Sequence, residues 1–270
     1  MLVNLLSKPG IRIDSRLTEG GSYMLLNVLL AILEFVFLFG MIPVARKFFG
    51  KEGLVGLMVM DLLLANTQVL KVIELGTPIL SVALGNAAFA AIFTASDLIN
   101  HKYGAKEARK AITVATTFYC VYFLAMQLTL AFKPGANDYV QESLMSVFGT
   151  DGLYIWMSVG GIMSFYIGQL LNTYIFSWLV KKIKSKGKIA LWFKSATSST
   201  ANLLENFIFG ALGYVILPRI FASQVIMPFS LVVSSSLIGT VIEGIITIVS
   251  PLFLLIGAHK FFDPKTEQSN

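Results

Sequence analysis

The sequence predicts an all-α polytopic membrane protein, a bundle of about seven transmembrane helices. The 270-residue chain is 56% hydrophobic and only 13% charged, about half the charged fraction of an average soluble domain. Its mean hydropathy is +0.75. Apolar segments recur along it, and each is long enough to cross the hydrocarbon core of a bilayer, which takes about 18 to 20 residues.

Short polar connections divide the chain into seven apolar segments, with only Gly76, Thr77 and Pro78 between the second and the third. The last segment is long enough to be tilted, or broken near Pro251. No soluble domain fits in the connections, so residues 1–270 form one membrane domain. The segments are predicted at about 23–45, 54–75, 79–99, 111–132, 152–180, 195–217 and 225–258.

Basic residues are distributed unevenly among the connections. Fifteen lie in connections 46–53, 100–110 and 181–194 and in the C-terminal tail, all on one side of a seven-span chain. Five lie on the other side: Lys8, Arg12, Arg16, Lys133 and Arg219. The positive-inside rule places the first side in the cytoplasm. The N-terminus is then predicted outside, the C-terminus in the cytoplasm, and connection 133–151 outside.

The N-terminal residues 1–22 are mixed and polar. They lack the apolar core and the small-residue cleavage site of a signal peptide. We therefore expect them to remain as an extracytoplasmic tail.

The formal net charge of +6 is explained by this topology, and we expect no nucleic-acid partner. The single cysteine, Cys120, excludes an internal disulfide and a cysteine-rich metal site. His101 and His259 lie at segment ends, which leaves no intramembrane histidine cluster for zinc. No H-E-x-x-H, G-x-S-x-G or G-x-x-x-x-G-K-[ST] pattern occurs. We therefore predict no cofactor, no ATP hydrolysis by this chain and no enzyme activity.

Asp97 lies near the end of a long apolar segment, three residues before Asn100. On a helix this spacing places both side chains on one face. A charge inside a span costs about 2.5–3.5 kcal/mol on insertion scales, so such residues usually face a cavity or another polar group. Ligand binding and helix packing are both open for this pair.

Two further polar pairs show the same spacing of three residues. Gln169 and Asn172 lie in the fifth span, and Asn202 and Glu205 lie in the sixth. Amides and carboxylates form directional hydrogen bonds, which suit a planar polar ligand. We predict that these four residues, with Asp97 and Asn100, converge on one cavity; hydrogen bonding between helices is the alternative.

Other charged residues in the spans have more than one interpretation. Glu34 fits an interhelix hydrogen bond as well as a ligand contact, and Asp61 fits the membrane interface. Lys71 and Glu74 are three residues apart and can pair on one helix face. Glu243 has no oppositely charged neighbour in its own span, so it needs a partner from another helix, a proton, water or a cationic ligand.

A stripe of small residues runs along the fifth span, at Gly160, Ser164 and Gly168. Small residues four apart let a neighbouring helix approach closely. We expect this stripe to hold Gln169 and Asn172 in a fixed place.

These residues resemble the queuosine precursor transporters, also called the vitamin uptake transporter-like family. The resemblance covers about residues 57–258 and rests on three blocks: Asp97-Leu98-Ile99-Asn100 with Tyr103-Gly104 and Ala108-Arg109; Ser164 to Asn172 and on to Phe176; and Ser199-Thr200 with Asn202 and Glu205. Asn66, Lys71 and Pro251 also look like family residues. Where the family usually has a lysine in the last span, this chain has Glu243.

The resemblance implies a six-helix core, residues 54–258, similar to the substrate-binding subunits of energy-coupling-factor vitamin transporters. Helix 23–45 is then an N-terminal addition. It implies uptake of a 7-deazaguanine precursor of queuosine across a bacterial plasma membrane. The implied partners are the lipid bilayer, the deazaguanine and a candidate separate ATPase module. The candidate substrate-binding residues are Asn66, Lys71, Asp97, Asn100, Gln169, Asn172, Asn202, Glu205 and Glu243.

Three alternative functions are considered beside the one that the resemblance implies. The chain could be the substrate-binding subunit of an energy-coupling-factor importer for another vitamin, which a copurifying ATPase pair would favour. An intramembrane enzyme lacks the necessary nucleophile or metal motifs. A purely structural membrane protein does not explain the number of intramembrane carboxylates.

Overall fold

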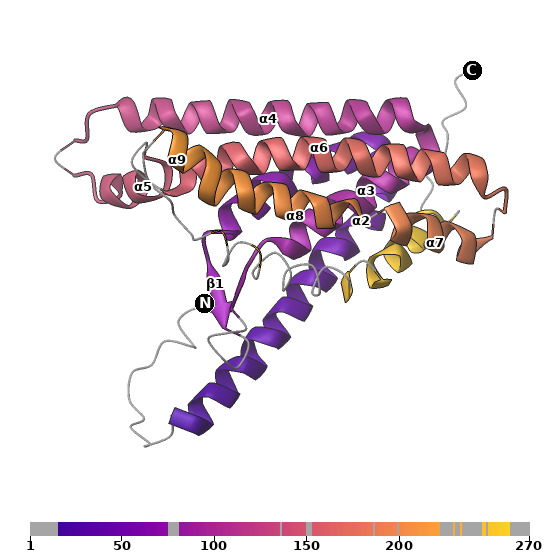
Figure 1. The fold of residues 1–270 in the computed structure, drawn as a ribbon, viewed down its shortest axis with the longest axis horizontal. Coiled ribbons are helices and arrows are strands. Elements are labelled where there is room, and N and C mark those ends of the chain that lie inside the picture. Colours follow the sequence, from indigo (N-terminus) through magenta and orange to yellow (C-terminus); the bar gives the residue numbers. More distant parts are fainter. Residues whose placement is uncertain are drawn as a thin grey trace.

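The computed structural model describes residues 16–74, 81–135, 137–149, 153–185, 187–198, 200–221, 229, 233, 245–246 and 248–259. Residues 1–15 of the expected tail and Glu243 lie outside these ranges. The described residues are almost all helical, and long helices pack side by side (Figure 1). The predicted all-α membrane bundle is confirmed, and the count of seven spans stays a prediction.

Helix α2, Arg16–Gln68, contains the first two predicted spans. The sequence predicted a loop over 46–53 between them, but the structure has a sharp turn at Gly50. The φ of 63° and ψ of −138° of this residue are accessible to glycine. The helix begins at Arg16, so the part of the expected tail from residue 16 to 22 is helical. The N-terminal part of α2 extends away from the other helices (Figure 1), and Leu25 and Leu33 on it are 62% and 63% exposed.

A short antiparallel hairpin replaces the ends of the second and third predicted spans. Strand β1, Val72–Glu74, pairs with β2, Ser81–Ala83, with Ile73 opposite Val82. The span predicted at 54–75 therefore ends at Gln68, and the one predicted at 79–99 begins at Asn86. Hydropathy alone does not separate a short apolar strand from the end of an apolar helix.

Helix α3, Asn86–Tyr103, is followed directly by α4, Ala105–Ala131. Only Gly104, with a φ of 89°, interrupts the two helices, so the predicted connection 100–110 is shorter than expected. The lysines, arginine, glutamate and alanines of this segment favour helix, which explains the longer helices. A salt bridge of 2.8 Å between Lys51 Nζ and Glu107 Oε2 ties α2 to the start of α4.

The two longest predicted connections each contain a short helix. Helix α5, Gln141–Phe148, lies in connection 133–151, and Asp138 Oδ1 accepts hydrogen bonds from the amides of Val140 and Gln141 at its start. Helix α7, Lys188–Ser198, lies largely in connection 181–194. Between them runs α6, Leu153–Lys182, which at 1.5 Å per residue is about 45 Å long.

The sixth predicted span, 195–217, is interrupted after Ser198. It continues as α8, Ala201–Ala211, then as the π-helix η2, Leu212–Ile216, and the short α9, Leu217–Phe221. Of the last predicted span, 225–258, the described part includes an apolar helix over Ile248–Gly257, which is continuous through Pro251. Arg46 donates a hydrogen bond to the carbonyl of Gly257, which joins this helix to α2.

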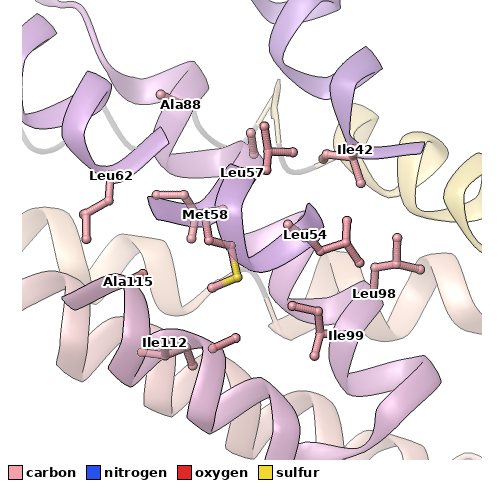
Figure 2. Packing of buried hydrophobic residues seen from close by; sticks show 14 of the residues in the cluster. Ile42, Leu54, Leu57, Met58, Leu62, Ala88, Leu98, Ile99, Ile112 and Ala115 are labelled. Carbon is pink, nitrogen blue, oxygen red and sulfur yellow. The ribbon is translucent and has the colours of Figure 1, made fainter. Parts of the chain in front are cut away.

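Three helical segments of the described chain are long and apolar enough to cross a membrane: Met24–Gln68, Ala105–Ala131 and Lys188–Phe221. The apolar core lies where α2, from Leu38 onward, packs on α3 and α4 (Figure 2). Alanines on α3 let α2 approach closely, while Leu54, Met58 and Ile112 fill the space between the helices. This packing sets the position of α3, which contains the polar pair Asp97 and Asn100.

Candidate substrate-binding site

Asp97 of α3 is completely buried, and its carboxylate accepts hydrogen bonds from α6 and α7. Asn172 of α6 donates to Oδ1 over 2.9 Å, and two hydroxyl groups of α7 donate to Oδ2: Ser195 over 2.6 Å and Ser198 over 3.1 Å. Hydrogen bonds to a charged acceptor are about twice as strong as neutral ones. Three donors therefore stabilise the carboxylate of Asp97 within the bundle.

Asn100, one helical turn further along α3, forms a second connection to α6. Its side-chain amide donates to the carbonyl oxygen of Thr173 over 3.2 Å and to Ser177 Oγ over 3.1 Å. The polar face predicted for α3 therefore lies against α6. Asp97 and Asn100 hold these helices together at two successive turns.

The small-residue stripe of α6 lies against α8 and η2, as the sequence predicted for a closely approaching helix. A Cβ at Gly160 would lie 2.8 Å from the backbone nitrogen of Gly213, so only hydrogen fits there. At Gly168 an added Cβ would meet the side chain of Glu205, whose own Cβ would lie 2.9 Å away. Because Gly168 of α6 has no side chain, there is room at this position for the side chain of Glu205 of α8.

A small cavity lies between α3, α6 and α8. Asn202 and Glu205 line it on α8, and Ser164 lines it on α6. Its volume is about 30 Å³, room for about one water molecule, whereas small-molecule sites usually measure about 300–1,000 Å³. The remaining lining residues are Val69, Asn86, Phe89, Phe93, Asn206 and Phe209. In this conformation the cavity is too small for such a ligand, so binding requires the helices around it to separate.

Gln169 of α6 is completely buried, and neither atom of its side-chain amide has a hydrogen-bond partner in the described part of the chain. The same holds for Oδ1 of Asn172 and Oδ1 of Asn202. An unsatisfied buried polar group costs about 1–3 kcal/mol. These amides therefore retain unused hydrogen-bonding capacity in the interior, which a polar ligand can satisfy.

The structure separates the six residues predicted to converge into two groups. Asn202 and Glu205 line the cavity, whereas Asp97, Asn100 and the amide nitrogen of Asn172 form contacts between helices. Gln169 does not line the cavity, but it follows Gly168, on which Glu205 packs. Helix α6 connects the two groups because Gln169 and Asn172 lie one turn apart.

Of the other predicted site residues, Asn66 of α2 is buried and points its Oδ1 at Gly161 of α6, where an added Cβ would lie 2.5 Å away. Its amide nitrogen donates to the carbonyl of Leu62 over 2.9 Å. Lys71 lies exposed between α2 and β1 and does not line the cavity. Glu243 is not among the described residues.

Sequence reasoning did not select Ser195 and Ser198, the two hydroxyl donors to Asp97. Their spacing of three residues is the same as that of the selected pairs, but serines are too common in helices to signal a site on their own. Asn86 and Asn206 were visible as polar residues in apolar spans. Asn206 also lies one turn after Asn202, which was the available signal for its place on the cavity.

These features define a polytopic α-helical membrane protein with a polar site enclosed between helices. A family model described as "Putative vitamin uptake transporter" matches residues 83–256. The "Probable queuosine precursor transporter" of Bacillus subtilis (strain 168) is 31% identical over 189 residues, which cover 70% of this chain and 78% of that protein. The chain belongs to this family of membrane transporters. No solved structure matches it significantly.

Proposed function

We propose that this protein takes up a 7-deazaguanine precursor of queuosine into the cytoplasm. The observation that carries the proposal is a set of buried amide atoms without a hydrogen-bond partner in the described residues: both side-chain amide atoms of Gln169 and the Oδ1 atoms of Asn172 and Asn202. Of these three residues, Asn202 lines the cavity together with Glu205. The similarity to the Bacillus subtilis protein, whose name specifies a queuosine precursor, supports the same ligand class.

The guanine edge of a deazaguanine fits the chemistry of these groups. Its ring N–H and exocyclic amino group are donors for the carboxylate of Glu205 and for the amide oxygens of Asn172 and Asn202. Its carbonyl oxygen is an acceptor for the amide nitrogen of Gln169. Such a ligand would satisfy the amide atoms of Gln169, Asn172 and Asn202 that have no partner in the described residues.

Uptake requires the closed cavity to open. The interface between α6 and α8–η2 is the candidate for this movement, since it contains the cavity and a π-helix. Single π-helical turns are frequent at functional sites, because they loosen the regular hydrogen bonding of a helix. Separation of α8 from α6 would expose Asn202 and Glu205 together.

The test is a binding screen of deazaguanines against the purified protein by calorimetry. The aminomethyl form, the nitrile form and queuine are the ligands, and guanine and adenine are the comparison bases. Binding of at least one precursor, lost in Glu205→Ala while the protein stays monodisperse, supports the proposal. Binding of none of the precursors contradicts it.

A second candidate is the substrate-binding subunit of an energy-coupling-factor importer for another vitamin. The family description, which names vitamin uptake in general, favours keeping it. Purification from its native membrane in mild detergent distinguishes the two. A copurifying pair of ATPases favours the importer subunit, whereas uptake by this chain alone in proteoliposomes contradicts it.

A further inference from the structure

Asp61 lies in the second half of α2 with a completely buried side chain. At 1.5 Å per residue it is about 16 Å along the helix from the turn at Gly50. Lys47 and Lys51 flank that turn, as expected of a helix end at the membrane surface. Since the hydrocarbon core is about 30 Å thick, Asp61 lies near its middle. On this argument Asp61 lies deeper than the interfacial position that the sequence suggested for it.

The surroundings of Asp61 are apolar. On its own helix the neighbours one turn away are Leu57, Met58, Leu64 and Ala65. Neither carboxyl oxygen has a hydrogen-bond partner among the residues that the structure describes. Within the described part of the chain, the site therefore offers an ionised carboxylate no donor and no ion-pair partner.

Helices α3, α4 and α6 pack against α2, and their titratable groups do not compensate this burial. Asp97 of α3 forms its hydrogen bonds with α6 and α7, and Tyr119 of α4, although buried in the same core, does not donate to Asp61. Tyr166 of α6 is partly exposed. Glu243 lies outside the described residues.

The two buried aspartates differ in their hydrogen bonding. Asp97 has three donors, which stabilise its ionised form. Asp61 has none, and an isolated buried carboxylate takes up a proton because the ionised form is poorly solvated there. A carboxyl group buried this deeply without a hydrogen bond that stabilises the fold is expected to have a functional role.

We propose that Asp61 is the proton-carrying residue of a proton-coupled uptake mechanism. The proton binds the carboxylate from the outer side and leaves it on the cytoplasmic side as the substrate is released. Asp61 is buried in this conformation, so the movement that admits the substrate must also separate α2 from its neighbours and expose the carboxyl group. This inference rests on the proposed uptake function.

A proton fits this position better than a metal cation. The described residues hold no group of three or more histidine, cysteine, aspartate or glutamate side chains that could ligate a metal ion. A sodium or calcium site needs several oxygen ligands around the ion, whereas a proton needs one carboxyl oxygen.

The experiment uses the full chain in proteoliposomes with a radiolabelled deazaguanine, at zero membrane potential. For the wild type, an acid-outside gradient of one pH unit should raise the steady-state accumulation about tenfold for one proton carried per substrate. Asp61→Asn should lose this stimulation but retain counterflow, the exchange of labelled for unlabelled substrate. Asp138→Asn, a matched change in an exposed loop, should behave like the wild type.

Infrared difference spectroscopy gives a second readout. The wild type should show the carbonyl band of a protonated carboxylic acid, and Asp61→Asn should lack that band. The proposal is overturned if the band is the same in both, if Asp61→Asn still accumulates substrate with the pH gradient, or if only a sodium gradient drives the wild type. Absence of wild-type counterflow with every deazaguanine has a different meaning: the proposed function fails, and this inference fails with it.

Discussion

Asn172 of α6 donates its side-chain amide to Oδ1 of Asp97 in α3 over 2.9 Å, although 75 residues separate them in the chain. Asn172→Ala removes a donor to a buried carboxylate, which costs about 1–3 kcal/mol. We expect a clearly lower thermal unfolding temperature in detergent, followed by circular dichroism. The exposed Asn137→Ala serves as the control, and equal unfolding temperatures would show that this bond does not hold α3 and α6 together.

Gln169 should show the opposite behaviour, because its amide has no partner among the described residues. Gln169→Ala removes no hydrogen bond of the closed protein, so its unfolding temperature should lie close to that of the wild type. Its affinity for a deazaguanine should fall about tenfold or more, since a lost hydrogen bond that leaves ligand groups unsatisfied costs about 1–3 kcal/mol. Wild-type affinity by calorimetry would remove Gln169 from the site.

The contact between Gly160 and Gly213 predicts a strong effect of one methyl group. Gly160→Ala places a Cβ 2.8 Å from the backbone nitrogen of Gly213, which has no flexible side chain to move. We expect a loss of about 1–3 kcal/mol in stability, measured by thermal unfolding. Gly56→Ala is the matched control because nothing lies within 4 Å of its added Cβ. An equal effect of both substitutions would contradict the close approach of α6 to η2.

The sequence predicted the helical membrane fold because the hydropathy of long spans is a strong signal. It did not predict the hairpin at Ile73, because three-residue apolar strands look like the end of an apolar helix. It also overestimated the lengths of the connections around Gly50 and Gly104. There a single glycine with a positive φ reverses the chain, and the flanking basic residues remain helical.

For the site, spacing along single helices identified Asp97, Asn172 and Glu205 as buried polar residues, and the structure confirms their burial. Spacing does not state which helix faces which, so it could not separate the hydrogen-bonded Asp97 from the cavity residue Glu205. It also could not show that Asp61 lies in the core, because the end of its helix depends on the turn at Gly50.

The orientation of the chain is tested by single cysteines in a Cys120-free background. The basic asymmetry predicts Lys184 in the cytoplasm and Asn137 outside, and both positions are exposed. An impermeant thiol reagent should label Asn137→Cys in intact cells and Lys184→Cys only after the cells are opened. The reverse pattern would overturn the predicted topology.

The charge of the site predicts a preference among queuosine precursors. Glu205 lines the cavity, and Glu243 occupies the place where the resembled family usually has a lysine. An anion in place of a cation favours a cationic ligand, and the aminomethyl precursor and queuine are cations at neutral pH, whereas the nitrile is neutral. A charge-assisted hydrogen bond contributes roughly 1.5–3 kcal/mol, so the amines should bind about tenfold or more tightly than the nitrile.

Glu243→Gln should narrow this difference, since it removes one negative charge with little change in size. Calorimetry with the aminomethyl and nitrile precursors on the wild type and the variant measures both ratios. Asp138→Asn, in the exposed loop before α5, removes a charge that is not part of the cavity lining and should leave the ratio unchanged. Equal wild-type affinities for the two precursors, or an unchanged ratio in Glu243→Gln, would exclude this glutamate from ligand recognition.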